Sequence, residues 1–558
     1  MQGPFVRDGK TLLSGIDPAG RAERIADSVP IKDRTLYFCP SPLYGYGLER
    51  LLERLAAEAP NSAVLCIEAE PELFELARNS IAPLLARNKN LRITNVCEEA
   101  ALCAFVRESW GARAFRRLET ARLSGGWQLF PQLYDSLCET LRREIAADWG
   151  NAMTLAKLGR LYIRNALANL SLMPVFPSID RLSFGSAVVL VLGAGPSLDE
   201  TLDALDLCFH ESLCSPESRP FRIICADTCL GALKDRNIVP DLAVILESQH
   251  WNLRDFTGCR GWNVPSAIDL SALPASTRVL GGEGFLFMTP WTNLRIFERL
   301  KEAGLLPAVI PPLGSVGLTA VELARRLSRG KIILSGLDFS FSFDKYHARG
   351  TPGHRARLNA HTRLRGLFNT SAYTASLAAV SKSGGSVRTG HVMRNYRDLF
   401  EREFAQDPRL FDMPGTGLPL GVKTLSVEEA LGILSRTGAQ ARREEGEEEK
   451  GEREERGLLT EKVLSFFNGE IARLKELRDI LTGDAATGLD RLGVLVDECD
   501  YLWAHFPDYS GGRRPVSGEI ASGKDSAVSF LKRVRAEIDP MLKLIEAKCG
   551  LFAGAGPD

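Results

Sequence analysis

The segment from Ala187 to Glu200, AVVLVLGAGPSLDE, constrains the fold more than any other part of the chain. It opens with an unbroken apolar run, Ala187–Leu192, that has the length of a strand and is rich in valine. Such a run is typical of a parallel strand that is buried on both faces. A strand of this kind normally belongs to an α/β sheet that is covered by helices.

A glycine-containing turn follows this strand and is a candidate phosphate site. It consists of Gly193, Ala194, Gly195, Pro196 and Ser197. Glycines let the backbone turn sharply and approach a ligand, and Ser197 is expected to cap a helix that begins next to it. The spacing matches neither the dinucleotide fingerprint nor the P-loop. A nucleotide site and an ordinary strand-to-helix turn therefore both stay open.

Two further strands are predicted to end in polar side chains. Phe221–Ala226 is followed by Asp227 and Thr228, and Asn237–Glu247 ends in Glu247. Ligands of open α/β sheets bind at the carboxyl ends of the strands. We therefore expect these groups to face one crevice together with the glycine turn. Taken singly, each acid is also explained as a helix cap or as a solvated loop residue.

The second half of this region repeats the pattern. Gly314 and Ser315 precede a predicted helix, Gly317–Leu327, whose free N–H groups could hold an anion. A buried strand, Lys331–Leu334, follows and leads to Asp338. These residues add a second anion-binding helix terminus and another acid to the predicted crevice.

Four motifs, taken in order, resemble the central domain of the motility-associated factor family. They are GAGPSLD from Gly193, ADTCLGALKDRNIVPDLAVILE from Ala226, GSVGLTAVELARRL from Gly314, and GLDFSF from Gly336 with a following Tyr346-His347. The resemblance spans roughly residues 180 to 425. One departure is visible, because Glu247 stands where many relatives are expected to have Asp, which puts the ribose or metal contacts there in question.

The resemblance implies a function and a fold. Members of this family are bacterial glycosyltransferases that attach nonulosonic, sialic-acid-like sugars to flagellin. The domain family also includes archaeal 6-hydroxymethylpterin diphosphokinases, and its fold is similar to that of bacterial sialyltransferases that use CMP-activated donors.

A basic stretch downstream carries the candidate catalytic residues. Asp344–Arg365, DKYHARGTPGHRARLNAHTRLR, contains three histidines and five arginines. Arg349 and its neighbours could pair with the phosphate and the carboxylate of a CMP-sugar donor. His347 could act as the base at the acceptor or stabilise the leaving phosphate. Tyr346 is similar to the tyrosines that hydrogen-bond the departing phosphate in sialyltransferases. The alternatives are a solvated basic loop and a Tyr-His pair that only closes the site.

Composition excludes several classes of protein. With 69 Lys and Arg against 70 Asp and Glu, the net charge of -1 gives no global field that would recruit nucleic acid or a membrane. No signal peptide and no run of eighteen apolar residues is present, so we expect a cytoplasmic protein without membrane insertion. The 12 cysteines are scattered, and they indicate neither a zinc site nor a disulfide framework.

The N-terminal region repeats the α/β theme in weaker form. Thr35–Cys39 and Ala63–Ile67 are predicted strands, and the second is followed by Glu68, which in a nucleoside-binding half-fold would accept from ribose. The glycines of the first loop have bulky neighbours, so a structural domain is favoured over a cofactor site. Its expected role is to contact the protein substrate or a second copy in a homo-oligomer. Residues 107–172 are predicted to be helical.

The C-terminal region changes character. Ala441–Arg456 contains eight Glu against five Lys or Arg and few apolar residues, which indicates a linker or a solvated helix end. From Leu458 onward apolar residues recur at helical spacing, as in Val463, Phe467 and Leu474. A helical bundle is therefore predicted, more typical of packing or partner binding than of catalysis.

Together these patterns predict an α/β protein with a central Rossmann-like doubly wound sheet. A smaller α/β domain with a helical connector precedes it (1–175), the catalytic domain spans 176–430, and a charged linker (431–457) leads to C-terminal helices (458–558). The predicted activity is transfer of a pseudaminic or legionaminic acid type sugar from its CMP-activated form to Ser or Thr of flagellin. The alternatives are a Mg²⁺-dependent diphosphokinase acting on a pterin alcohol and a non-catalytic flagellin-binding protein. Mg²⁺ is the one candidate cofactor.

Overall fold

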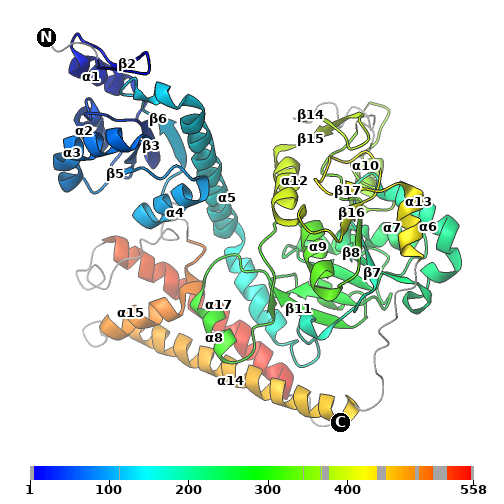
Figure 1. Cartoon of the computed structure of the whole chain (residues 1–558). Coiled ribbons are helices and arrows are strands. Elements are labelled where there is room, and N and C mark those ends of the chain that lie inside the picture. Colours follow the sequence, from blue (N-terminus) through cyan, green and yellow to red (C-terminus); the bar gives the residue numbers. More distant parts are fainter. Residues whose placement is uncertain are drawn as a thin grey trace. The chain divides into compact units, whose positions relative to one another are not determined.

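The chain forms two compact units in the computed structural model (Figure 1). The structure describes residues 5–111, 114–342, 345–364, 366, 376–435, 448–483, 489–506 and 525–553. The first unit comprises Met1–Gly159 and Trp503–Phe530, and the second comprises Arg160–Leu502 and Leu531–Asp558. The four predicted segments are cut at other places, and their boundaries stay a prediction.

The first unit contains a four-stranded parallel sheet with the order β5-β4-β3-β6 and a separate antiparallel pair, β1 with β2. Its elements are β1 (Phe5–Arg7), β2 (Lys10–Leu13), α1 (Pro18–Ser28), β3 (Thr35–Pro40), α2 (Leu48–Glu58), β4 (Ala63–Ile67), α3 (Pro71–Arg87), β5 (Leu91–Thr94), α4 (Glu99–Trp110), β6 (Arg117–Thr120) and the first part of α5 (Pro131–Leu170). Both faces of the sheet are covered. Tyr37 and Cys39 pack against α1 and α2, whereas Leu36 and Phe38 pack against α4 and α5.

The acid that a nucleoside-binding half-fold would use for ribose, Glu68, is hydrogen-bonded to protein groups. Glu68 is fully buried, and its carboxylate accepts hydrogen bonds from Ser41 Oγ at 2.6 Å and from the Tyr134 hydroxyl at 3.2 Å. Burial raises the pKa of Glu68 above its ordinary value. Because these partners come from the protein itself, the arrangement fits the structural interpretation of this region.

The prediction of continuous helix over residues 107–172 is wrong in its first part. Helix α4 ends at Trp110, and β6 then pairs in parallel with β3 before α5 begins at Pro131. Gly125 lies against the backbone of Thr11, a contact that leaves no room for a side chain. Helical periodicity in the flanking segments concealed a short edge strand that only its sheet partner stabilises.

The second unit is built on a nine-stranded sheet in which all neighbouring strands are parallel. Its order is β12-β11-β10-β9-β8-β7-β13-β16-β17. The strands are β7 (Val188–Leu192), β8 (Phe221–Ala226), β9 (Leu242–Ile245), β10 (Ser266–Asp269), β11 (Gly284–Met288), β12 (Ala308–Val309), β13 (Ile332–Ser335), β16 (Leu410–Asp412) and β17 (Lys423–Thr424). Strand order reverses between β7 and β13, which makes this a doubly wound sheet as predicted.

Helices and short elements cover this sheet. They are the end of α5, α6 (Leu198–Leu213), α7 (Leu230–Asp235), α8 (Arg295–Glu302), α9 (Val316–Leu327), α10 (Pro352–Asn359), α12 (His391–Phe404) and α13 (Val427–Leu434), with a hairpin of β14 (Leu377–Val380) and β15 (Ser386–Thr389). On one face, α9 and α12 share a core with Val189 and Val191 of β7 and Leu334 of β13 (Figure 1). Helix α9 crosses β7, β8, β9 and β13.

The C-terminal helices are α14 (Glu448–Thr482), α15 (Leu489–Glu498) and α17 (Asp525–Ala553). The predicted linker thus overlaps both α13 and the start of α14, and residues 436–447 lie outside the described ranges. The predicted apolar stripe of α14 is buried at Val463, Phe467 and Leu474, but it also includes a fully buried acid, Glu470. Arg299 of α8 pairs with Glu470 at 2.7 Å, which fixes α8 against α14.

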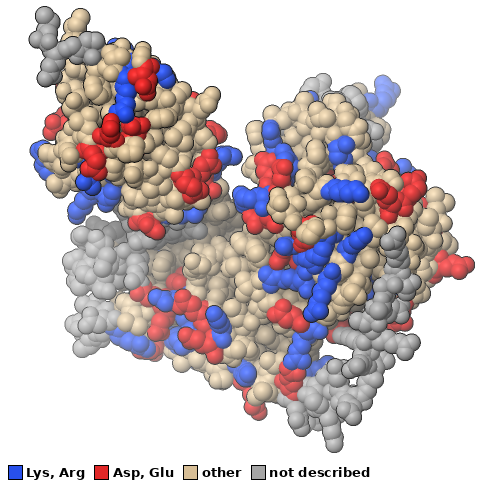
Figure 2. Space-filling view, viewed as in Figure 1, with Lys and Arg blue, Asp and Glu red and all other residues tan. Residues whose placement is uncertain are grey.

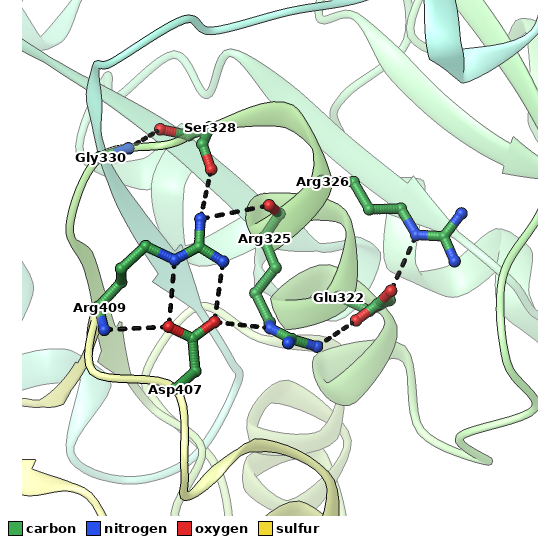
Figure 3. Close-up of polar contacts among 7 residues, drawn as sticks. All are labelled: Glu322, Arg325, Arg326, Ser328, Gly330, Asp407 and Arg409. Carbon is green, nitrogen blue, oxygen red and sulfur yellow. Dashed lines mark hydrogen bonds and ion pairs between the residues drawn. The ribbon is translucent and has the colours of Figure 1, made fainter.

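A charged network ties together the amino ends of β13 and β16 (Figure 3). Asp407 accepts hydrogen bonds from Arg409 at 2.8 Å and from Arg325 at 2.9 Å. Arg409 also donates to the carbonyl of Ser328 at 2.8 Å, and Glu322 bridges Arg325 and Arg326. The network joins the end of α9 to the loops that start the two strands, so it sets β16 beside β13.

Lys and Arg side chains gather over the region of α9 on the face drawn in Figure 2. Two arginines of α9, Arg325 and Arg326, are both paired with Glu322. These arginines therefore stabilise the fold locally.

We expect Asp407→Asn to lower the free energy of unfolding by about 1–3 kcal/mol at neutral pH, because an amide cannot accept from both arginines. The hydrogen bonds from Arg409, followed by those from Arg325, hold the pKa of Asp407 below its ordinary value of 3.8. Stability from a lowered pKa is complete above the unfolded pKa and is lost as the pH falls toward the folded pKa, so the difference between wild type and variant should begin to shrink below about pH 4.

Denaturant unfolding followed at pH 7 and pH 3 measures this difference. Asp398→Asn is the matched control, because Asp398 pairs with Arg397 in a position where its side chain is 54% exposed. Its cost should stay below about 1 kcal/mol. Equal destabilisation by both variants, or a cost of Asp407→Asn that is no smaller at pH 3 than at pH 7, would contradict the assigned role of Asp407.

Candidate active site at the carboxyl edge of the nine-stranded sheet

The turns that follow β7 and β13 meet where the strand order reverses. The N–H groups of Gly193 and Gly195 donate to the carbonyls of Ser335 and Gly336, both at 2.8 Å. A Cβ at Gly195 would lie 2.5 Å from Asp338 Oδ2 and 2.6 Å from the Gly336 oxygen. Gly195, which was predicted to let a ligand approach, is therefore also required by the packing of the turn after β13 against it.

Ser197 and Asp338 join these two turns. Asp338 is buried and accepts from the Ser197 N–H at 2.7 Å and from the Ser197 hydroxyl at 2.6 Å. The predicted side-chain cap by Ser197 is wrong, because Ser197 occupies the N-cap position of α6 but makes no capping hydrogen bond. Its hydroxyl instead donates to Asp338, which is distant in the sequence. Both Asp338 oxygens are committed to Ser197, so Asp338 positions the turn.

The N-termini of α6 and α9 approach the same point. A Cβ at either Gly193 or Gly317 would lie within 2.7 Å of Leu337 Cδ2, so the turn after β7 and the first turn of α9 both pack on this side chain. Gly314, with φ of +68°, and Ser315 lead into α9, and Ser315 makes no side-chain cap. The backbone N–H groups of two helices of more than ten residues are thus brought to one edge, where an anion is favoured.

The basic stretch is anchored beside the glycine turn. Asp199, buried in the first turn of α6, accepts from the backbone N–H of Arg349 at 3.0 Å and pairs with Lys345 at 2.7 Å. Lys345 also donates to the Pro196 carbonyl at 2.9 Å. Asp344 and Arg365, the ends of the predicted stretch, lie outside the described residues. The Arg349 side chain is 72% exposed, so it is accessible to a ligand.

Tyr346 and His347 occupy a packed part of this stretch. The Tyr346 ring stacks on Phe341 with 3.8 Å between the ring centroids. The Arg357 guanidinium lies 4.8 Å from the centroid of the Tyr346 ring. Burial, followed by the charge of Arg357, lowers the pKa of His347, so the imidazole is neutral at pH 7. Its Nδ1 is buried and has no hydrogen-bond partner within the described ranges. A neutral imidazole can accept a proton.

Carboxyl groups crowd at the ends of β8 and β9. Asp227 is buried and accepts from Asn252 Nδ2 at 2.7 Å and from the Thr228 N–H at 2.8 Å. Burial, followed by the charge of Asp255, raises the pKa of Asp227 to about 7, and the charge of Glu247 adds to this. Burial likewise raises the pKa of Asp255 to about 6. Asp227 and Glu247 are therefore close enough to interact, as the strand positions predicted.

Two buried asparagines from α5 hold the loops that follow β9 and β10, and sequence reasoning missed them. Asn165 Nδ2 donates to the carbonyls of Ser248 at 3.1 Å and Ser271 at 3.0 Å. Asn169 Nδ2 donates to the carbonyls of Leu270 at 2.9 Å and Ala272 at 2.8 Å. Two asparagines four residues apart in an otherwise apolar helix segment were the available signal.

Another pair that the sequence did not indicate lies behind the glycine turn. Lys382 and Asp412 are both buried and pair at 2.7 Å at the end of β16. Burial raises the pKa of Asp412 to about 6 despite the opposing charge of Lys382. Gly415, in the loop after β16, approaches Ser197 so closely that a Cβ there would lie 2.6 Å from the serine Cβ. The loop after β16 therefore completes the wall next to Ser197.

The acids suit a divalent cation only in part. Oxygen ligands are the type that Mg²⁺ prefers, and it often uses one or two carboxylates together with substrate phosphates. Among the described residues, however, no group of three or more His, Cys, Asp or Glu is arranged to hold a metal ion. The residues therefore do not form a protein cage for a metal, and Mg²⁺ stays a prediction.

The site divides the carboxyl edge by charge. Helix N-termini and the basic stretch lie at β7 and β13, whereas Asp227, Glu247 and Asp255 lie at β8 and β9. This arrangement defines an α/β protein with a candidate site for an anionic ligand at the reversal point of a doubly wound sheet. No helix within the described ranges combines the length and apolar content needed to cross a bilayer.

Comparisons with known proteins show similarity to a known family and to a known fold. Residues 164–344 match the family described as 6-hydroxymethylpterin diphosphokinase MptE-like. An uncharacterised protein of Treponema pallidum (strain Nichols) is 28% identical over 539 residues, which cover 94% of this chain and 90% of that protein. The fold is similar to that of the MAf glycosyltransferase from Magnetospirillum magneticum AMB-1, with a TM-score of 0.53 and 14% identity over 98% of this chain and 90% of that one.

These findings confirm the predicted resemblance to the motility-associated factor family. The family match starts within α5, at residue 164, and so includes the two asparagines that hold the strand-end loops. It ends at residue 344, before Tyr346 and His347. The structural similarity extends across both units and the C-terminal helices.

We expect Asp227→Asn to flatten the pH dependence of stability. A carboxyl group whose pKa rises from 3.8 to about 7 on folding makes the folded state bind the proton more tightly than the unfolded chain. The free energy of unfolding therefore falls as the pH rises from about 4 to about 7, on the order of 1–4 kcal/mol for this group. The amide cannot ionise, so the variant lacks this part of the decline.

Urea unfolding at pH 4.5 and pH 7.5 measures how far the free energy of unfolding falls with pH in the wild type and in the variant. Glu200→Gln, a change at an exposed position of α6, is the control and should leave the wild-type slope intact. If the free energy of unfolding of Asp227→Asn falls with pH as steeply as that of the wild type, folding does not raise the pKa of Asp227, and its hydrogen bonds offset the effect of burial.

Proposed function

We propose that this protein is a glycosyltransferase that moves a nonulosonic acid from a CMP-activated donor to Ser or Thr of flagellin. The observation that carries the proposal is the reversal point of the sheet, where the N-termini of α6 and α9 meet beside a basic stretch. A donor of this class carries a phosphodiester and a carboxylate, and both need cationic or N–H donors. The similar fold of the MAf glycosyltransferase supports this class of reaction.

The residues take distinct roles in this proposal. The N–H groups at the start of α9 hold the donor phosphate, because those of Gly193, Gly195 and Ser197 before α6 already donate within the protein. The exposed guanidinium of Arg349 binds the donor carboxylate. His347 accepts the proton of the acceptor hydroxyl as the oxygen bonds to the anomeric carbon. The bond from that carbon to the phosphate oxygen breaks, its electron pair leaves on CMP, and Tyr346 donates to the departing phosphate. Asp227 and Glu247 accept from the ribose or the cytosine.

A diphosphokinase is the second candidate, favoured by the family that matches residues 164–344 and by the carboxyl groups at β8 and β9. Such an enzyme transfers diphosphate from ATP to a pterin alcohol, with Mg²⁺ bound between carboxylates and phosphates. Asp227 and Glu247 would supply those carboxylates. The two candidates differ in nucleotide and in product, so both can be measured directly.

We expect the purified protein to bind CMP or CTP more tightly than ATP, GTP or S-adenosylmethionine. The reason is that the proposed donor presents a cytidine monophosphate to the site. Titration calorimetry with each nucleotide, with and without Mg²⁺, measures the order of affinities. Tighter binding of ATP together with diphosphate transfer to a pterin alcohol would support the second candidate.

We expect flagellin that is co-expressed with this protein and a nonulosonate pathway to gain the mass of one or more sugars. Glu247→Gln should reduce this transfer by roughly 10- to 1000-fold, the range for loss of one positioning or electrostatic contact. Because Glu247 Oε1 accepts from the Gln249 N–H at 2.9 Å, which an amide oxygen can still do, the melting temperature should shift by only a few degrees.

Intact-mass spectrometry of flagellin, with Glu200→Gln as the control, gives the result. Binding of flagellin without any mass gain would favour the non-catalytic alternative. Loss of thermal stability in Glu247→Gln with activity per folded molecule preserved would mean that Glu247 only closes a turn.

A further inference from the structure

A cavity of about 290 Å³ lies in the second unit, and its lining includes neither Tyr346 nor His347 nor the glycine turn. It is formed where α5 and the C-terminal part of α17 face the segment after β10. Its lining combines apolar groups with cationic ones, namely Ala168, Asn169, Leu172, Pro274, Arg278 and Lys548. This volume lies near the lower end of the range for small-molecule sites.

Two cations line this cavity without a visible counter-charge. Arg278 follows β10 in the chain and Lys548 is in α17, so they come from segments 270 positions apart. Neither has an ion pair or a side-chain hydrogen bond within the described ranges. Burial, followed by the charge of Arg278, lowers the pKa of Lys548. Lys548 is half-buried whereas Arg278 is exposed, so the repulsion from Arg278 acts on a partly desolvated ammonium group, and an anion bound between the two would offset it.

Asn169, which also lines the cavity, carries a buried hydrogen-bond acceptor. Asn169 is fully buried, and its Oδ1 has no partner in the part of the chain that the structure describes. Its Nδ2 donates to the carbonyls of Leu270 and Ala272, so the amide cannot rotate without losing two hydrogen bonds. A buried acceptor without a donor costs free energy, which a ligand N–H or O–H would recover.

We propose that this cavity binds a small organic anion that bears a phosphate or a carboxylate and a hydrogen-bond donor. The anionic group pairs with Arg278 and Lys548, the donor binds Asn169 Oδ1, and the body of the ligand packs on Leu172 and Pro274. This site is separate from the proposed donor site and does not rest on the proposed transferase activity. Because Asn169 donates to the carbonyls of Leu270 and Ala272, the ligand also contacts a residue that holds the loop after β10.

Direct binding of simple probes to the full-length protein tests the proposal. 4-Aminophenyl phosphate carries the anion, an apolar ring and a donor, phenyl phosphate lacks the donor, and 4-aminobenzoate replaces the phosphate by a carboxylate. We expect 4-aminophenyl phosphate to bind about 2- to 10-fold more tightly than phenyl phosphate, the effect of one hydrogen bond. The comparison with 4-aminobenzoate decides which anionic group the site prefers.

The double variant Arg278→Met and Lys548→Met should weaken binding of 4-aminophenyl phosphate at least about 10-fold, because both counter-charges are gone while the apolar stems remain. Arg278→Lys with Lys548→Arg keeps the charge and should retain affinity within a few-fold. Saturating CMP should leave the binding unchanged. Affinity that is equal in the methionine variant, competition by CMP, or no binding up to about 10 mM would each overturn the proposal.

Discussion

The bond between Asp338 and Ser197 is the interaction on which the site depends. It joins two turns that lie 141 positions apart in the chain, at the one place where the sheet changes direction. Both carboxylate oxygens are used, and the glycines at 195 and 417 leave space for them, since a Cβ at either would lie within 2.6 Å of Asp338 oxygens. Because the acid is buried and fully engaged, the turn after β7 is fixed before any ligand binds, which reduces the entropy lost on binding.

Burial divides the carboxyl edge into two electrostatic halves. At β8 and β9 it raises the pKa of Asp227 to about 7 and that of Asp255 to about 6, so these carboxyl groups bind protons more tightly than ordinary acids do. At β7 and β13 two helix N-termini and an anchored basic stretch favour negative charge. An anionic ligand with a polar, hydroxyl-bearing body matches this division better than a uniformly charged polymer does.

Elements distant in sequence supply the support for these loops. Asn165 and Asn169 reach from α5 to the loops after β9 and β10, and Lys382 reaches Asp412 from the loop after β14. Glu470 of α14 binds Arg299 and so fixes the segment after β11. Each of these polar side chains is buried and replaces water around groups that would otherwise lose hydrogen bonds on folding.

The sequence by itself determined the elements whose signals are local. The apolar runs predicted β7, β8, β3 and β4. Together with the glycine turn and the order of the motifs, they predicted a doubly wound sheet. Only the tertiary structure decided which residue pairs with Ser197, that β6 forms an edge strand, and which loops the asparagines of α5 hold. It also decided the burial and the neighbouring charges that raise the pKa of Asp227. The physical reason is the same in each case. These features arise from contacts and burial between segments far apart in the chain, and neither periodicity nor spacing records which distant group a side chain will meet.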